Sequence, residues 1–143
     1  MIRKLQNGDI NRVTDLWLKT NLEAHNFIPE PYWTGNYEAV KKMLPQAEVY
    51  VYEDDKMIQG FIGINDEYIE GIFVSDEMQS RGIGKMLLDY IKDKKDRLQL
   101  KVYQKNVRAM SFYQREGFTI QSEGMDEFTG EKEYVMNWES FGI

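Results

Sequence analysis

The sequence contains no cysteine, and this absence removes several kinds of chemistry at once. Disulfide bridges, thiolate metal sites and cysteine nucleophiles all need a thiol, so none of them can operate in this chain. Histidine is almost as scarce, because His25 is the only one in 143 residues. One histidine cannot build a multi-histidine zinc site, and the sequence has no G-x-S-x-G elbow with a nucleophilic serine. We therefore expect no metal site and no serine hydrolase.

Long apolar runs are missing as well. The longest runs are only a few residues, and Met1–Lys4 is not followed by the apolar stretch of a signal peptide, so we expect a cytoplasmic protein without a membrane association. The formal net charge of −6 disfavours extended nucleic-acid binding, which needs a basic face. The basic residues of the second half form either a local patch or ordinary solvated charges: Arg81, Lys85, Lys101, Lys105, Arg108 and Arg115.

Hydrophobic periodicity predicts one domain over residues 1–143. A hydrophobic content of 42% is enough for a single core. The segment 25–33, "HNFIPEPYW", reads as a structured loop because of its two prolines. Strands are expected at 2–5, 49–53, 57–64, 67–75, 98–103, 118–123 and 132–138, and helices at 10–20, 37–44, 83–91 and 107–116. The order βααβββαβαββ indicates an α/β domain with a mixed central sheet flanked by helices.

The stretch "MQSRGIGKMLLDYI", 78–91, places two glycines in the first turn of an amphipathic helix. The apolar stripe of that helix is Ile83, Met86, Leu87, Tyr90 and Ile91. The first turn of a helix has unpaired N–H groups and the positive end of the dipole, so Gly82 and Gly84 would let an anion reach the backbone. The alternative is that the glycines only end a loop. Neither a P-loop nor a dinucleotide fingerprint fits, because the G-K-[ST] ending and the full glycine set are absent.

Two blocks of the chain resemble the GNAT superfamily of acyl-CoA-dependent N-acetyltransferases. "QSRGIG" matches the family's Q/R-x-x-G-x-G/A turn through Gln79, Gly82 and Gly84. "NVRAMSFYQREGF", 106–118, matches the family's N-x-x-A-x-x-F-Y-x-x-x-G-F block. The predicted strand between the two blocks, and the order of elements over nearly the whole chain, also agree with this family.

The resemblance implies that the anion is the pyrophosphate of coenzyme A, held by backbone N–H groups of residues 81–85. The pantetheine arm would then lie along strand 69–74 and pair with it like an added strand. Gly71 either marks the bulge that this family uses to separate its central strands or is an ordinary strand glycine. The implied cofactor-binding residues are Phe73, Val74, Gln79, Arg81, Gly82, Ile83, Gly84, Lys85 and Asn106.

The resemblance also suggests catalytic groups. Tyr113 is the expected acid for the departing thiolate, or else a core aromatic, and Asn106, seven residues earlier, either only caps the helix or also binds the cofactor. Glu70 is the candidate general base or a solvent-facing carboxylate, with Tyr68 on its face of the strand. A strand N–H, chosen as that of Val74, would meet the oxyanion.

The acceptor would lie under the loop that holds His25, Phe27 and Trp33, together with Tyr68. The acidic net charge favours a cationic acceptor, so we expect transfer of acetyl from acetyl-CoA to a primary amine of a small molecule or peptide. Two alternatives remain: an acyl-CoA-binding regulatory module without turnover, and an acetyltransferase for an RNA-linked amine. The chain would act as a monomer or homodimer.

Overall fold

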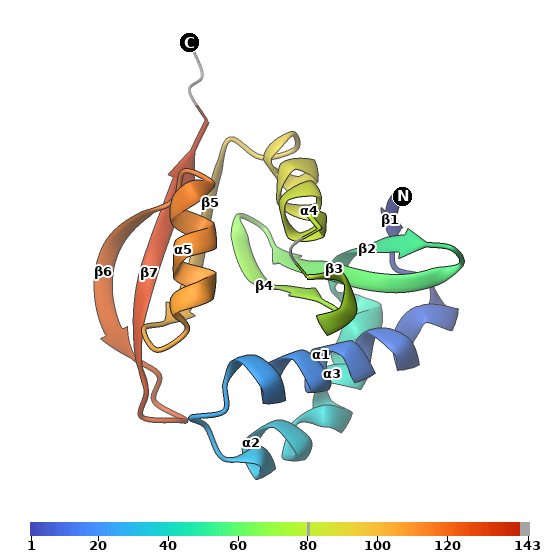
Figure 1. Ribbon diagram of the computed structural model, residues 1–143, viewed down its shortest axis with the longest axis horizontal. Helices are drawn as coiled ribbons and strands as arrows, with labels where there is room; N and C mark the ends of the chain where they lie inside the picture. Colours follow the sequence, from blue (N-terminus) through green and yellow to red (C-terminus); the bar gives the residue numbers. More distant parts are fainter. Residues whose placement is uncertain (80, 141–143) are drawn as a thin grey trace.

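The protein is described by a computed structural model that covers residues 1–79 and 81–140 (Figure 1). Its strands are β1 (Ile2–Lys4), β2 (Glu48–Asp54), β3 (Met57–Asn65), β4 (Tyr68–Val74), β5 (Arg97–Tyr103), β6 (Thr119–Met125) and β7 (Lys132–Glu139). Its α-helices are α1 (Ile10–Ala24), α2 (Glu30–Gly35), α3 (Tyr37–Met43), α4 (Ile83–Lys92) and α5 (Val107–Arg115). Short 3-10 turns lie at Asn7–Asp9, Leu44–Gln46 and Asp76–Met78.

All seven strands form one mixed sheet in the order β1-β2-β3-β4-β5-β7-β6. Every neighbouring pair is antiparallel except β4 and β5, which run parallel. The parallel pair needs a crossover, and α4 supplies it between the two strands. The α/β architecture with a mixed central sheet is therefore confirmed.

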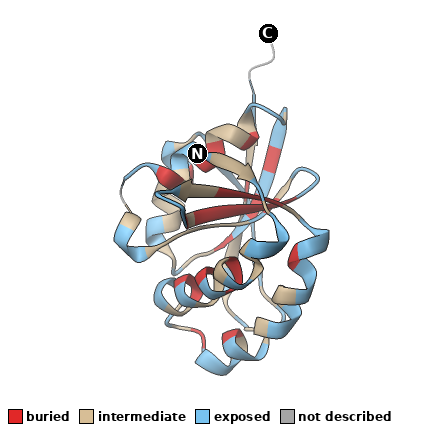
Figure 2. Ribbon diagram, turned by 90° about the vertical axis from the view of Figure 1, so that its right-hand side faces the viewer, coloured by how far each residue is buried: buried red, intermediate tan, exposed pale blue. Residues whose placement is uncertain are grey.

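Two apolar cores lie on opposite faces of the sheet. The larger core holds the buried side chains of α4 and α5 against β3, β4, β5 and β7, and Leu87, Leu100 and Met136 are at its centre. The smaller core packs Val13 and Leu16 of α1 against β2 and β3. Figure 2 shows the result: the central strands are buried, and the helices have bands of buried residues between exposed ones.

Two local expectations need correction. The segment expected as loop at 25–33 leads into a short helix, α2, whose first turn contains the second proline. Proline is tolerated there because the first helical residues need no N–H partner. In α4, Met86 is 40% exposed and Leu88 is fully buried, because the face that packs on the sheet is rotated about the helix axis from the expected stripe.

Candidate active site

The parallel pair β4–β5 separates soon after it begins. Only Tyr68 and Ile69 of β4 pair with β5, whereas β3 pairs along the whole of β4. In the β3–β4 register, Gly63 pairs with Gly71 and the next β3 residue pairs with Ile69, so Glu70 is left without a partner. The bulge expected near Gly71 is therefore confirmed. It turns the rest of β4 away from β5 and leaves its backbone edge unpaired toward β5 (Figure 1).

Phe73 explains why position 71 holds glycine. Its ring folds back over Gly71, where an added Cβ would lie 2.5 Å from two ring atoms. The same ring stacks on Phe61 with centroids 4.7 Å apart, on the α1 side of the sheet. Val74 instead packs in the core under α4. These two predicted cofactor neighbours thus lie on opposite faces of the separated strand.

The glycine turn gives α4 an exposed N-terminus. Gly82 is the N-cap residue with φ +81°, a left-handed conformation that favours glycine, and nothing lies within 4 Å of a Cβ built there. The first intrahelical bond runs from Met86 N–H to Gly82 C=O, so residues 83–85 have no helical acceptor. Gly84 lies 3.5 Å under the Phe112 ring, which is ordinary contact. Three N–H groups therefore point out of a turn with open space beside it.

Side chains around this turn form hydrogen bonds and ion pairs with residues of β4, α4 and α5. Gln79 donates to the Val74 carbonyl over 3.1 Å and accepts from Arg108 of α5 over 2.6 Å. Lys85 pairs with Glu116 over 3.0 Å and with Asp89 over 3.2 Å, contacts that raise the pKa of Lys85. Arg81 is exposed. No site role was predicted for Arg108, which reaches the glycine turn only because α5 packs beside it.

Tyr113 of α5 belongs to the larger core and lies within electrostatic reach of Tyr68 on β4. It is 8% exposed and makes edge-to-face contacts with Phe112 and Phe118. Within residues 1–79 and 81–140, its hydroxyl has no hydrogen-bond partner. Burial raises the pKa of Tyr113, and the nearby phenol of Tyr68 raises it further. The phenol is therefore neutral and has a free donor.

Tyr68 places a second phenol at the paired end of β4 and β5. The backbone N–H of Lys101 on β5, beyond the last paired residues of the two strands, acts on this phenol and opposes the rise of its pKa. Burial raises the pKa of Tyr68 to about 12, and the carboxylates of Glu70 and Glu133 add to that shift. Glu70 is exposed at the bulge, with its Cβ toward Gly63 on the α1 side. Glu133 lies on β7 and was not predicted as a site residue.

Asn106 and His25 join the acceptor loop to the start of α5. The expected cap is confirmed, since Asn106 Oδ1 accepts from the Ala109 N–H over 3.2 Å. The Nδ2 of Asn106 lies 3.1 Å from His25 Nε2, and His25 Nδ1 lies 3.0 Å from Asn21 Oδ1. Because Asn21 Nδ2 donates to the Trp17 carbonyl, its Oδ1 accepts from Nδ1–H, and Nε2 of a neutral imidazole accepts from Asn106. Burial lowers the pKa of His25 to about 4, which fits this neutral form.

Aromatic rings surround this imidazole. Trp33 stacks on His25 with centroids 5.4 Å apart, and Phe27 and Tyr103 meet it edge-on. The Tyr103 hydroxyl donates to Asp126 over 2.6 Å, which connects the loop to the β6–β7 turn. The structure thus gathers His25, Phe27 and Trp33 beside Tyr103 at the open end of the β4–β5 gap, whereas Tyr68, the fourth predicted acceptor residue, lies at the closed end. In this arrangement both ring nitrogens of His25 are already used.

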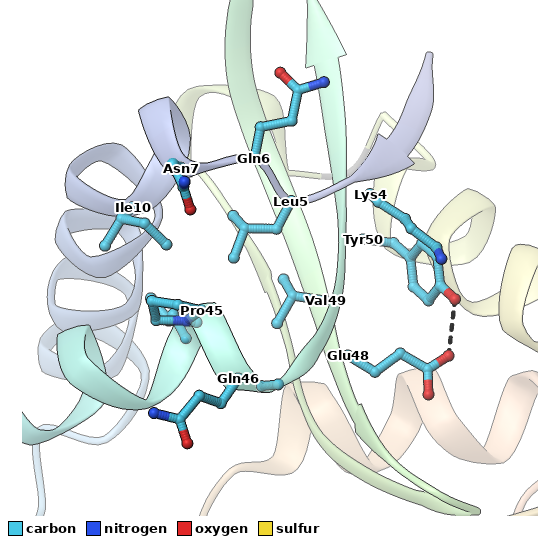
Figure 3. A pocket seen from close by; sticks show the side chains of 12 residues that line it. Lys4, Leu5, Gln6, Asn7, Ile10, Pro45, Gln46, Glu48, Val49 and Tyr50 are labelled. Atoms are coloured by element: carbon cyan, nitrogen blue, oxygen red, sulfur yellow. Dashed lines mark hydrogen bonds between the residues drawn. The ribbon is translucent and has the colours of Figure 1, made fainter.

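Two hollows of the described surface do not contain the glycine turn. One, of about 360 Å³, lies between the start of α1 and the start of β2, with Leu5, Ile10 and Val49 on its floor (Figure 3). None of the predicted site residues lines it. The other, of about 350 Å³, lies at the closed end of the gap and includes Tyr68 in its wall. Side chains that could jointly hold a metal ion are not found among the described residues, and no helix in that part of the chain could span a membrane.

Comparisons with known proteins agree with this geometry. Residues 45–120 match the family model described as "Acetyltransferase (GNAT) domain". The peptidyl-lysine N-acetyltransferase YiaC of Escherichia coli is 34% identical over 140 residues, which is 96% of each chain. The peptidyl-lysine N-acetyltransferase YjaB of Salmonella typhimurium is 26% identical over 120 residues, which is 83% of each chain.

Solved structures show the same fold. The apo form of Escherichia coli YjaB superposes with a TM-score of 0.86 at 19% identity, over 96% of each chain. A Bacillus anthracis structure in complex with acetyl coenzyme A superposes with a TM-score of 0.60 at 23% identity, over 66% of this chain and 62% of that one. The chain belongs to the GNAT acetyltransferase family. It is an enzyme that transfers an acetyl group from acetyl-CoA to an amine.

Proposed function

We propose that this enzyme acetylates the side-chain amine of lysine in peptides. The observation that carries the proposal is the 34% identity, over 96% of both chains, to a peptidyl-lysine N-acetyltransferase. The charge of the acceptor side supports it. Glu70, Asp126 and Glu133 lie around the gap, and the net charge of the chain is −6, which favours a cationic acceptor over an anionic one.

The glycine turn fits the pyrophosphate of coenzyme A. The N–H groups of residues 83–85 and the dipole of α4 favour an anion there, and the open space beside Gly82 leaves room for one. Arg108, fixed by Gln79, adds a cation at the rim. The unpaired edge of β4 fits an amide-bearing arm that adds to the sheet. Acetyl-CoA supplies the thioester carbonyl that the amine attacks.

Tyr113 is the proposed partner of the leaving sulfur. An alkyl thiol has a pKa near ~8.5, below that of a phenol, so complete proton transfer from Tyr113 would be uphill. A neutral phenol with a raised pKa can instead stabilise the thiolate by a hydrogen bond until a proton arrives. The backbone N–H of Val74 stays the proposed donor to the oxyanion.

Two carboxylates are available to accept the proton of the amine. The sequence predicted Glu70, which stands at the bulge on the α1 side of the sheet. Glu133 is the second, and its charge also acts on the Tyr68 phenol. Asn106 remains a proposed cofactor contact, although its amide already serves the N-cap and His25.

We further propose that residues 1–143 form one domain that acts in the cytoplasm as a monomer or homodimer. The single sheet, with a core on each face, supports one domain. Light scattering after size-exclusion chromatography measures the mass. A particle larger than a dimer would contradict this part of the proposal.

The test of the activity is a thiol-release assay after binding measurements. Calorimetric titration with acetyl-CoA, coenzyme A and ATP should show binding of the first two only. Thiol release is then measured with a lysine peptide, the same peptide with norleucine in place of lysine, spermidine, an aminoglycoside and an aminoacylated RNA. Turnover confined to the lysine peptide is expected. Turnover with another amine would reject the lysine assignment, and turnover with the RNA would revive the nucleic-acid alternative.

A further inference from the structure

We propose that Glu133 binds the ammonium group of the acceptor and takes its first proton. This inference rests on the proposed function, because it assumes a lysine-type primary amine. It assigns the general base to β7, and not to the strand on which the sequence placed it. Its position in the sheet, its electrostatic effect on the Tyr68 phenol and the absence of a partner for the carboxylate among the described residues carry the argument.

The position follows from the strand register. Glu133 pairs with Tyr103 of β5, and its neighbour Tyr134 packs in the core on the α5 side. Because successive side chains alternate between faces, Glu133 points to the opposite face of the sheet. Gln99 and Lys101 of β5 share that face and are exposed, so this part of the described structure has no helix over it. An acceptor can approach Glu133 from this open side.

A line of polar groups leads from Glu133 to the cofactor side. Tyr68 lies where β4 and β5 still pair, and the backbone N–H of Lys101 on β5 acts on its phenol. The charge of Glu133 raises the pKa of Tyr68, and Tyr68 in turn raises the pKa of Tyr113. The carboxylate and the two phenols therefore lie within electrostatic reach of one another in that order. An amine held by Glu133 stands at the end of this line, opposite Tyr113.

The carboxylate of Glu133 lacks the partner that other partly buried acids have. Asp9 bonds to Arg3, Glu116 to Lys85 and Asp126 to Tyr103. The Glu133 carboxylate has no hydrogen bond or ion pair within residues 1–79 and 81–140. A partly buried charge without a partner is costly, and an alkylammonium ion is the partner that would satisfy it.

The charged surroundings give this carboxylate the properties of a base. Burial raises the pKa of Glu133, Asp126 of the β6–β7 turn adds to that shift, and Lys101 of β5 opposes it. Tyr68 faces it from β4, and Gly124, its partner on β6, adds no charge. Glu70, by contrast, is exposed at the bulge. A partly buried carboxylate with a raised pKa is a suitable acceptor for the proton of an ammonium group.

The step balances as follows. The acceptor ammonium gives one proton to the Glu133 carboxylate, which later releases it to solvent. The neutral amine nitrogen attacks the acetyl carbon, so that an N–C bond forms and the C–S bond breaks. The second nitrogen-bound proton ends on the sulfur, with the Tyr113 hydroxyl hydrogen-bonded to the sulfur while it carries charge. The products are the acetylated amine, coenzyme A as thiol, and one proton in solution.

The test is the pH dependence of kcat/KM with a lysine peptide. In the wild type, Glu133 deprotonates bound ammonium, so kcat/KM should be level above the pKa of Glu133. Glu133→Gln should lower kcat/KM at pH 7 by about 100-fold. It should also make kcat/KM rise tenfold per pH unit toward the amine pKa of ~10.4, because only free neutral amine then reacts. Glu133→Asp should restore a level region.

Controls separate this role from a structural one. Glu123→Gln removes an exposed carboxylate from the same hairpin on the other face and should match the wild type. Acetyl-CoA affinity should be equal in all variants. The inference would be overturned if Glu133→Gln kept the wild-type pH dependence of kcat/KM. It would also be overturned if Glu70→Gln, and not Glu133→Gln, showed the steep rise with pH. If the wild type uses another amine, the lysine assignment fails, and the same profiles with that amine still decide the role of Glu133.

Discussion

The two sides of the β4–β5 gap are built in different ways. The proposed cofactor side consists of the turn at 81–85 and the helix at 107–115, two compact segments in which backbone groups are the proposed ligands of the turn. The acceptor side takes single side chains from the loop after α1, from β4, β5, β7 and from the β6–β7 turn. A local sequence motif therefore identifies the cofactor side, whereas the acceptor side forms only when distant strands pair in register.

The largest expected effect concerns the cofactor side. Gly82→Glu should weaken coenzyme A binding by about 100-fold or more, because it puts a negative charge at the N-terminus of α4 and opposes two charge-assisted bonds of roughly 1.5 kcal/mol each. Calorimetric titration measures the loss. Gly82→Asn is the matched control, since asparagine tolerates the left-handed conformation and should keep most of the affinity. Unchanged affinity in a folded Gly82→Glu variant would refute the phosphate assignment.

Tyr113→Phe tests the chemistry between the two sides. Loss of one hydroxyl should reduce kcat by about 100-fold, with coenzyme A affinity unchanged, because the ring packing is kept and only the hydrogen bond to sulfur is lost. Thiol release under saturating acetyl-CoA measures it. Tyr90→Phe, on the α4 surface beside Tyr50, serves as the matched control. A near-normal rate in Tyr113→Phe would leave the tyrosine as a core aromatic.

His25 tests how firmly the acceptor loop is joined to α5. Its pKa is lowered by burial from 6.5 to about 4, so the unfolded chain binds a proton at a higher pH than the folded one. Stability should therefore fall as the pH drops from 6.5 toward 4, by about 3 kcal/mol for this group alone. Urea unfolding across that range, compared with His25→Gln, isolates the contribution. Equal slopes for the two proteins would show that the imidazole is not held neutral.

The bulge offers a smaller and more local test. Gly71→Ala places a Cβ against the Phe73 ring and should cost about 1–3 kcal/mol of unfolding free energy. Gly63→Ala, on the paired position of β3, meets only an ordinary contact at 3.7 Å and should cost less. Chemical denaturation compares the two. A larger loss at Gly63 would mean that Phe73 moves aside easily.

Much of the fold could be predicted because its patterns are local. The period of α4 and the cap at Asn106 are confirmed, as is the order of the strands along the chain. The helix α2 was missed because a six-residue segment with one proline just before it and another in its first turn resembles a loop. Met86 is exposed and Leu88 is buried, contrary to the prediction, because neighbouring elements, and not periodicity, decide which face of the helix is buried.

The candidate site shows the same difference between features that are local in sequence and features that depend on tertiary packing. The sequence by itself predicted an anion site after β4 and placed Tyr113 two helical turns after Asn106, since a turn and a helix fix such distances locally. Only the tertiary structure decided that Arg108 reaches Gln79 and that Glu133 shares a face of the sheet with Gln99 and Lys101 of β5. Alternation along β7 defines two faces, but the register with β5 determines which of them borders the separated strands, and register is a property of the folded sheet.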